Sequence, residues 1–306
     1  MNLLDFIQTF PDEESCKLKF KQIREQEGVI CRKCGSKEHY WLTTIEHYKC
    51  KKCGTKTTLK SGTVLENTKL PIRYWFVAMH LITSTKKTFS ALELQRQLGH
   101  KYYEPIWAMM HKLRIIMGKR DDGYYLTNNI ELDEGFFEVA FDKKEEPLKR
   151  GRGSQRQAKV LVMTSQKPIK KKDQKPNKKT SKLRFIKMKV IDSLDAETIE
   201  SQVEEHIHNK STVNTDGYRS YTNLKQYVKK HVSNIVPPEE ASKSLPWVHT
   251  MISNAKRNLL GIHHMMTLRY IQNYLDEFCY KVNRRYQEDK IFDRLLIASV
   301  SITWKD

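Results

Sequence analysis

Acidic side chains interrupt an apolar stretch in the middle of the sequence, ELDEGFFEV at residues 131–139. Its pattern is typical of a buried β-strand, where Val or Ile would be expected in place of Asp133 and Glu134. Another acid, Asp216, lies where we expect a later strand to end. If the two strands are neighbours, Asp133 and Asp216 could meet at one edge of a sheet and bind Mg²⁺, which prefers oxygen ligands. Glu134 should point to the opposite side of its strand, so we do not assign it to the metal.

Two divalent ions about 4 Å apart can stabilise both the attacking and the leaving oxygen of a phosphoryl transfer. A simpler interpretation of the same residues remains open at this point. Asp133 and Glu134 could face solvent at a strand end, and Asp216-Gly217 could be an ordinary turn. The spacing alone does not decide between a metal site and a turn.

Cysteine spacing gives a second and more specific signal. Two CxxC pairs stand fifteen residues apart, and each is followed by a glycine. Paired thiolates on two turns, brought together by a hairpin, complete a tetrahedral structural zinc site with no open position. We expect the other two cysteines, Cys16 and Cys279, to be buried thiols. The predicted zinc ligands are Cys31, Cys34, Cys50 and Cys53, and the basic residues beside them (Arg32, Lys33, Lys51, Lys52) would suit phosphate contacts.

The charge composition of the chain indicates which class of partner it binds. The 306 residues carry 55 Lys and Arg against 36 Asp and Glu, a formal charge of +19. An excess of this size favours a polyanion such as nucleic acid, although a solvated basic surface is the alternative. The sequence has no apolar run long enough for a membrane span and no recognisable secretion signal. The two CxxC pairs indicate a metal site in a reducing compartment rather than a disulfide framework, and we expect a cytoplasmic protein.

The elements that must position these residues fall into two groups. Residues 1–28 predict two helices, and residues 71–118 predict further helices, including a pair joined by HKYYEP. This pair resembles a helix-turn-helix, with His111, Lys112 and Arg114 on its second helix. From residue 129 the pattern predicts three strands, a helix, two more strands and C-terminal helices, which is an α/β order. Lys-rich links, KRGRGSQRQ and KPIKKKDQKPNKKTSK, would separate the first three strands and could contact DNA backbone.

Several ordered motifs together resemble the transposases of the IS1595 family, whose catalytic domain is ISXO2-like. The motifs are CRKC with CKKC, SGTVLENTKLPIRYW, FSALELQRQLG, IWAMMHKLR, ELDEGFFE, VNTDGYRSY, WVHTMISNAKRNLLGIHH and YLDEFCYKVNRR. They cover most of the chain.

The resemblance implies an RNase H-like, DDE-type domain that cuts and joins DNA with two divalent ions, Mg²⁺ or Mn²⁺. Asp133 and Asp216 match the first and second catalytic aspartates of the family. For the third position, where many relatives have Glu, we expect Asn254 as a metal ligand, with Lys256 as an accompanying catalytic lysine. Glu277 is a rival third acid, although YLDEF also resembles the exposed side of a helix. His263 and His264 would cap a helix or contact phosphate.

The sequence therefore predicts a transposase that binds terminal inverted repeats in double-stranded DNA and cleaves and transfers strands. It would act in the prokaryotic cytoplasm, at the nucleoid, as a homo-oligomer assembled on DNA. The alternatives are a catalytically inactive zinc-ribbon DNA-binding protein and a transcription regulator. The expected parts are an N-terminal helical segment (1–28), a zinc ribbon (29–60), a helical DNA-binding region (61–122), an RNase H-like domain (127–290) and a C-terminal tail (291–306).

Overall fold

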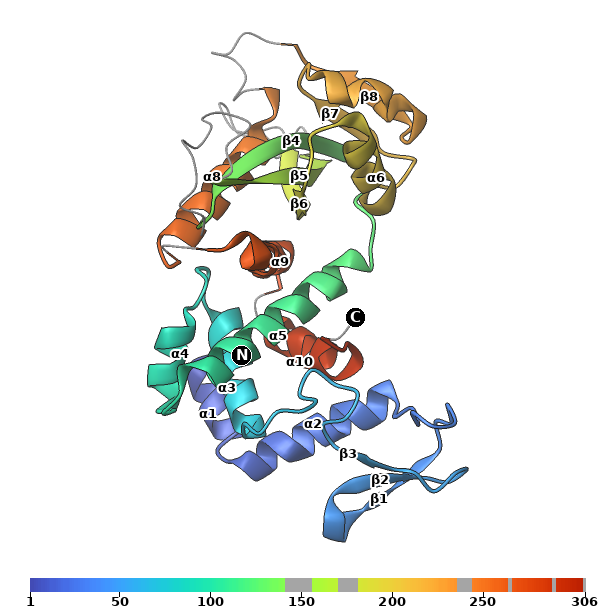
Figure 1. The fold of residues 1–306 in the computed structure, drawn as a ribbon, viewed down its shortest axis with the longest axis vertical. Helices are drawn as coiled ribbons and strands as arrows, with labels where there is room; N and C mark the ends of the chain where they lie inside the picture. The colour runs from blue at the N-terminus through green and yellow to red at the C-terminus, as the bar shows by residue number, and fades with distance from the viewer. Residues whose placement is uncertain (141–155, 170–180, 236–243, 264–265, 288–289, 305–306) are drawn as a thin grey trace, which may run out of the picture. The chain divides into compact units, whose positions relative to one another are not determined.

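The computed structural model describes residues 1–140, 156–169, 181–235, 244–263, 266–287 and 290–304. It consists of two compact units, one formed by Met1–Arg120 with Tyr286–Asp306 and the other by Asp121–Arg285 (Figure 1). Both Lys-rich links lie largely outside the described residues, and so does His264. Among the described residues, no helix is long and apolar enough to cross a membrane.

The second unit is built on a five-stranded sheet in the order β6-β5-β4-β7-β8. Three antiparallel strands, β4, β5 and β6, are followed by β7 and β8, which run parallel to β4. This mixed sheet with helices on both faces is an α/β fold, as predicted. The strands are β4 (Asn129–Glu138), β5 (Gln157–Pro168), β6 (Ser181–Ile191), β7 (Thr212–Thr215) and β8 (Lys230–Ser233).

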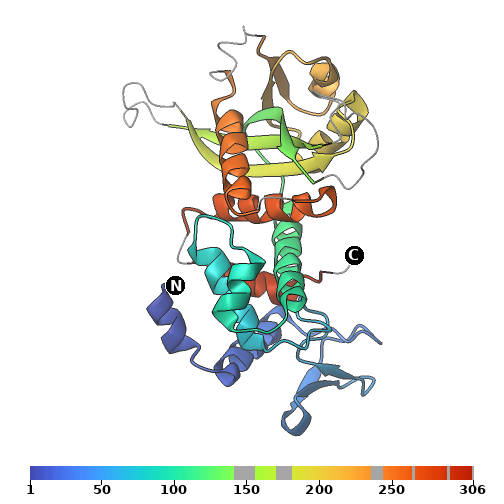
Figure 2. The ribbon, with the colours of Figure 1, turned by 60° about the vertical axis from the view of Figure 1, so that its left-hand side comes forward.

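Alternating side chains give the sheet two apolar faces, because successive residues of a strand point to opposite sides. Val160 and Val162 of β5 pack with helices α8 (Pro246–Leu260) and α9 (Leu268–Asn283) on one face. Leu161 and Met163 pack on the other face with α6 (Ala196–His206) and the 3₁₀ segment η4 (Arg219–Gln226). In Figure 2, α8 crosses the sheet as an orange helix. The arrangement places α8 on the same face as every second residue of β4.

The first unit is helical apart from a small antiparallel sheet. Its helices are α1 (Leu3–Thr9), α2 (Glu13–Glu27), α3 (Ile72–Ser84), α4 (Ala91–Leu98), α5 (Tyr103–Asp122) and α10 (Ile291–Ser301); the boundary between the units falls within the last turn of α5. Its strands are β1 (His39–Leu42), β2 (His47–Cys50) and β3 (Lys56–Thr58), with a short 3₁₀ turn, η1 (Thr43–Ile45), between the first two.

Helices α4 and α5 form the predicted helical pair. Ser90 caps α4 by accepting from the Glu93 N–H at 3.0 Å, and Gly99 ends it in a left-handed conformation. Of the three basic side chains expected on the second helix, Lys112 is partly exposed, but the other two are not on the surface. His111 and Arg114 are buried, and Arg114 donates to the Phe89 carbonyl. These two residues therefore stabilise the helical core, and a DNA contact through them is excluded in this conformation.

The C-terminal residues differ from the expected tail. Helix α10 lies within 291–306 and packs against α2 and α3. The ring of Phe292 contacts those of Phe6, Phe10 and Phe76. The cause can be read from IFDRLLIASV, whose apolar residues recur every three or four positions and so form one buried face.

Candidate metal centres

Strand pairing brings the two predicted aspartates together. β4 pairs in parallel with β7, with Glu131 beside Asn214 at the last pair. Two residues further along each strand, the same register places Asp133 beside Asp216, just past the end of β7. One oxygen each from Asp133, Glu134 and Asp216 all lie within 4.8 Å of one another. The first and fourth strands are therefore neighbours, as predicted, and their acids form one cluster.

Glu134 was expected on the opposite side of the strand from Asp133 and was therefore not assigned to the metal, but one of its oxygens lies in this cluster. Its position on the strand does differ from that of Asp133: Asp133 faces α8, while the charge of Glu134 acts on the buried hydroxyl of Tyr221 on the other face. However, β7 ends at Thr215, so the edge of β4 is unpaired beside the acids. Side chains from both faces can extend around a free edge, and strict alternation therefore does not separate their carboxylates.

The electrostatics of the acidic cluster favour a cation. Burial, followed by the hydrogen bond and charge of Glu134 and the charge of Asp216, raises the pKa of Asp133 to about 8. Glu134 Oε1 is buried and has no hydrogen-bond partner within the described part of the chain. A buried carboxylate oxygen without a donor is costly unless something else neutralises it. Clustered carboxylates with a spare ligand atom fit a hard divalent ion such as Mg²⁺ or Mn²⁺.

A histidine that the sequence reasoning missed lies beside this cluster. His249 is in the first turn of α8, and its Nδ1 is 3.6 Å from Asp133 Oδ2. The side chain is about one-third exposed, so its ring can reach both the carboxylate and solvent. Imidazole nitrogen and carboxylate oxygen can ligate the same divalent ion. His249, Ile252 and Lys256 all contact residues of β4. Their spacing of three and four residues puts them on one face of a helix, and this periodicity was the signal in the sequence that could have identified His249.

Asn254, the expected third ligand, is not brought to the acids. It follows His249 by five residues, which rotates it by roughly 140° around a helix of 3.6 residues per turn. Its Oδ1 accepts instead from the Arg257 guanidinium at 2.8 Å. The structure therefore corrects the expected position: the residue of α8 that meets Asp133 is His249.

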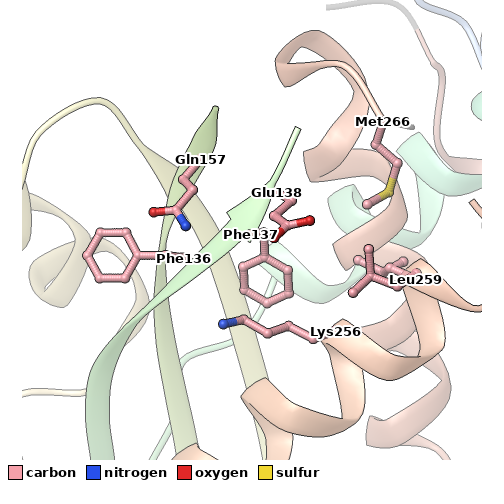
Figure 3. Close-up of a pocket in the computed structure, with 8 residues that line it drawn as sticks. Phe136, Phe137, Glu138, Gln157, Lys256, Leu259 and Met266 are labelled. Atoms are coloured by element: carbon pink, nitrogen blue, oxygen red, sulfur yellow. The ribbon is translucent and has the colours of Figure 1, made fainter. Parts of the chain in front are cut away.

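Lys256 lies on the same face of α8 as His249 but two turns further along. Its amine sits over the Phe137 ring, 5.7 Å from the ring centre, in a pocket of about 100 Å³ (Figure 3). Seven helical residues correspond to roughly 10 Å along the axis. Lys256 is thus near the cluster without belonging to it.

The rival acid, Glu277, and the histidine His263 lie in other surroundings. Glu277 is fully buried in α9 and forms an ion pair with Lys281 at 3.6 Å, so the expectation of an exposed helix face was wrong at this position. His263 follows α8, where its backbone N–H donates to the Leu259 carbonyl at 2.7 Å and its ring packs on Tyr274. Its backbone thus closes the end of the helix.

The first unit holds a second cluster, made of the four predicted cysteines. All four sulfurs lie within 4.8 Å of one another; Cys31 is 3.5 Å from Cys53, and Cys34 is 3.6 Å from Cys50. A tetrahedron with Zn–S bonds of about 2.3 Å has sulfur–sulfur edges of about 3.8 Å. The sulfurs are therefore spaced as a structural zinc site requires.

Two similar turns present these sulfurs. The N–H of Gly35 donates to the Cys31 carbonyl, and that of Gly54 to the Cys50 carbonyl, at 2.9 and 3.0 Å. Both glycines have φ near +70°, which is strained for other residues. The hydroxyl and backbone N–H of Thr55 lower the pKa of Cys53 to about 6, which favours the thiolate that binds metal.

The basic residues next to the cysteines are not equally available for DNA. Lys33, Lys51 and Lys52 are exposed or nearly so. Arg32 instead forms a two-pronged ion pair with Glu66, which is mostly buried. Arg32 is therefore engaged within the protein.

Family models match both the part of the chain that holds the acidic cluster and the part that holds the four cysteines. Residues 125–283 match the ISXO2-like transposase domain, and residues 11–56 match the transposase zinc-ribbon domain. A protein of the transposable element ISH50 of Halobacterium salinarum is 25% identical over 167 residues. That match covers 51% of this chain and 55% of the relative, so the chain spans about half of the relative's length.

Two solved structures of the Mos1 transposase are more distantly similar. The paired-end complex with the left transposon end has a TM-score of 0.29 and 10% identity, covering 78% of this chain and 82% of that one. The mariner paired-end complex with Mn has a TM-score of 0.30 and 12% identity, covering 77% and 81%.

The first family match alone extends over more than half of the sequence, and it contains both the mixed sheet and the acidic cluster. The second contains all four cysteines. The chain therefore belongs to the family of proteins with an ISXO2-like transposase domain, here preceded by a transposase zinc ribbon.

Proposed function

We propose that this protein is a DNA transposase that cleaves and transfers DNA strands with divalent metal ions. The observation that carries the proposal is the cluster of Asp133, Glu134 and Asp216, partly buried in a chain of charge +19. Acids gathered in such a basic protein are explained if they hold cations that in turn receive a phosphodiester. Family membership supports the same activity.

In this proposal, Asp133 and Asp216 are the metal-holding pair and His249 takes the third position. Asp133 lies near both Asp216 and His249, so its carboxylate could bind a metal ion together with either of them. Glu134 supplies a further oxygen from the free edge of β4. Mg²⁺ or Mn²⁺ bound here would lower the pKa of the attacking water or 3′-hydroxyl and stabilise charge on the phosphate.

The surrounding residues would orient DNA at this centre. Lys256 lies on the His249 face of α8 and is placed to bind a phosphate next to the one being cleaved. In the other unit, the zinc ribbon with Lys33, Lys51 and Lys52, together with the α4–α5 pair, would bind the inverted repeats at the ends of the element.

A cleavage assay tests the proposal. The substrate is duplex DNA carrying the inverted repeats that flank the coding region, incubated with Mg²⁺ or Mn²⁺ and examined for strand cleavage and joined products. Asp133→Ala and Asp216→Ala should abolish both products while retaining DNA binding. Glu204→Ala, which removes an exposed acid on α6, is the matched control and should cleave normally.

The same assay separates the enzyme from its alternative. If the wild-type protein binds the repeats but gives no product with either ion, it is a DNA-binding protein without catalytic activity. The histidine at the third position, where many relatives have a carboxylate, makes this comparison necessary, because a neutral ligand gives up one negative charge and weakens metal binding.

Strand transfer requires two DNA ends to be joined, and we therefore propose that the protein assembles as an oligomer on paired ends. Sedimentation of the complex with paired-end DNA measures its stoichiometry. A complex containing a single protein chain would contradict this part of the proposal.

A further inference from the structure

A buried glutamate lies two residues before the first aspartate, on the same face of β4. Glu131 is only 3% exposed. Its Oε2 accepts from the backbone N–H groups of Trp247 and Val248 at 2.7 and 2.9 Å. Its Oε1 accepts from Gln166 Nε2 at 3.0 Å. A buried carboxylate of β4 is thus hydrogen-bonded to the beginning of α8.

The carboxylate of Glu131 satisfies donors at the start of α8 for which the N-cap residue supplies no acceptor. The first N–H groups of a helix have no partner within the helix. Here the N-cap residue is Leu245, whose side chain has no acceptor, and Pro246 has no N–H to satisfy. The His249 N–H already donates to the Leu245 carbonyl at 3.2 Å. The two remaining donors, on Trp247 and Val248, are those that Glu131 accepts.

A closed ring of hydrogen bonds fixes the carboxylate itself. Gln166 of β5, which donates to Glu131, accepts through Oε1 from the Ser181 hydroxyl at the start of β6. Ser181 Oγ in turn accepts from the indole Nε1 of Trp247 at 2.9 Å. The ring returns to the same helical turn whose backbone Glu131 binds. It joins three strands to α8, so the start of the helix cannot shift without breaking several buried bonds.

The ring stands directly beside the candidate metal centre. Trp247 and Val248 immediately precede His249, and Glu131 precedes Asp133 by two residues on the strand. A second close contact lies on the other side of the Asp133–His249 pair. At Gly135 an added Cβ would be 3.0 Å from the Phe137 ring and 3.4 Å from Ile252 of α8. Helix and strand are therefore held together on both sides of the pair.

We propose that Glu131 is a positioning residue, which holds the start of α8 against β4 so that His249 meets Asp133. The inference rests on the proposed metal-dependent function, since it explains how the third ligand is placed. Glu131 would act through the helix backbone, because its carboxylate binds the N–H groups of Trp247 and Val248, the residues just before His249. Partners that orient metal ligands in this indirect way typically contribute 10–100-fold to metal affinity, as an order of magnitude.

The test compares two substitutions of similar shape. Glu131→Met removes both acceptor oxygens, whereas Glu131→Gln keeps one oxygen for the two helix donors, and the Gln166 amide can rotate to keep its bond. Mn²⁺ affinity of the full-length protein is measured by titration calorimetry, with Tm recorded for each variant. We expect Glu131→Met to weaken Mn²⁺ binding by about 10–100-fold and Glu131→Gln to stay within about threefold of wild type.

A stability control separates positioning from general destabilisation. Val203→Ala creates a cavity in the core on the opposite face of the sheet and should lower Tm with Mn²⁺ affinity unchanged. If Glu131→Met fails to fold, Trp247→Phe, which removes only the indole donor to Ser181, should still weaken Mn²⁺ binding several-fold.

Three results would overturn the role of Glu131: wild-type affinity in Glu131→Met or Trp247→Phe, equal weakening in the Met and Gln variants, or a loss that Val203→Ala reproduces. A different result would refute the proposed function instead, namely a wild-type protein whose Mn²⁺ binding is absent or unaffected by Asp133→Asn.

Discussion

The cysteine cluster and the acidic cluster are assembled in opposite ways. The four cysteines lie within Cys31–Cys53, on two similar turns joined by a short hairpin. The acids come from β4 and from the residue after β7, 83 positions later, and His249 comes from a helix further along the chain. The first site needs only its own small sheet to form. The second requires a complete five-stranded sheet and a helix packed across it.

The two clusters also differ in how their ligands are prepared for metal. In the cysteine cluster, hydrogen bonds from Thr55 lower the pKa of Cys53 to about 6 and favour the charged ligand, whereas, against a backbone hydrogen bond from Ser36, hydrogen bonds with the neighbouring cysteines raise the pKa of Cys34 to about 12. At Asp133, burial and neighbouring acids raise the pKa to about 8 and oppose the charged ligand. A local turn can supply donors to its own thiolates, whereas carboxylates gathered from several elements repel one another until a cation arrives. Metal binding should therefore drive folding of the zinc ribbon, whereas in the acidic cluster it should neutralise repulsion between carboxylates that the fold has already brought together.

The largest effect is expected at the ribbon. Cys34→Ser should abolish zinc binding and unfold residues of the small sheet, since structural zinc contributes about 10–16 kcal/mol in comparable small sites. Metal analysis and far-ultraviolet circular dichroism measure this. Cys16→Ala, at a buried thiol outside the cluster, should retain the full zinc content. Loss of zinc in both variants would mean that the cluster is not the binding site.

Removing charge from the acidic cluster should have the opposite effect on stability. Asp133→Asn should reduce DNA cleavage by at least about 10³-fold. It should nevertheless raise the Tm of the metal-free protein by about 2–4 °C per kcal/mol of relieved repulsion. Cleavage assays and thermal unfolding in chelator measure the two changes. A fall in Tm would show that Asp133 stabilises the fold even without metal. The acidic cluster would then not differ from the zinc ribbon in how its ligands affect stability.

A pair of substitutions on α8 sharpens the assignment of the third ligand. His249→Ala should weaken Mn²⁺ binding by about 10–100-fold. Asn254→Ala removes a side chain that bonds Arg257, and it should change affinity by no more than about twofold, as for other surface substitutions. Titration calorimetry on both variants measures the difference. The reverse order of effects would restore Asn254 as the ligand.

A further acid, Asp276 of α9, separates the effect of burial on a carboxyl group from the effect of metal binding. Burial raises its pKa to about 7, although Lys189 and a hydrogen bond from Gln272 oppose the shift. Because the folded state holds this proton while the unfolded state releases it near pH 4, the group lowers stability as pH rises from about 4 to 7. Asp276→Asn should remove this loss, by a few kcal/mol at most. The Tm of the Asn variant should match that of wild type near pH 4 and exceed it at pH 8, with Mn²⁺ affinity unchanged. If variant and wild type had the same Tm at pH 8 as well, the raised pKa of Asp276 would be contradicted.

What could be predicted from the sequence follows the same division between local and distant order. CxxC spacing identifies the cysteine cluster, because every ligand belongs to one short motif. The pairing of Asp133 with Asp216 was predicted from the family resemblance, because the spacing alone left an ordinary turn as the alternative, and the parallel pairing of β4 with β7 brings the two residues together. Glu134 was misplaced because alternation does not describe the unpaired edge that arises where β7 stops at Thr215.

Residues that depend on helix orientation were harder to predict. His249 and Asn254 are both polar residues of one helix, and the contacts of His249, Ile252 and Lys256 with β4 show which face of that helix meets the strand. The ring around Glu131 was not visible either, since it joins residues 131, 166, 181 and 247 from four elements. The residue bounds of the five expected parts of the chain remain a prediction, except that the expected C-terminal tail contains helix α10.

The return of α10 to the first unit has a practical consequence for dissecting this protein. A fragment that stops at residue 120 would carry the ribbon and the first five helices but would leave Phe6, Phe10 and Phe76 without the Phe292 ring that covers them. Such a fragment should aggregate when expressed alone. Supplying residues 286–306 through a short linker after residue 120 should yield soluble material suitable for mapping DNA contacts.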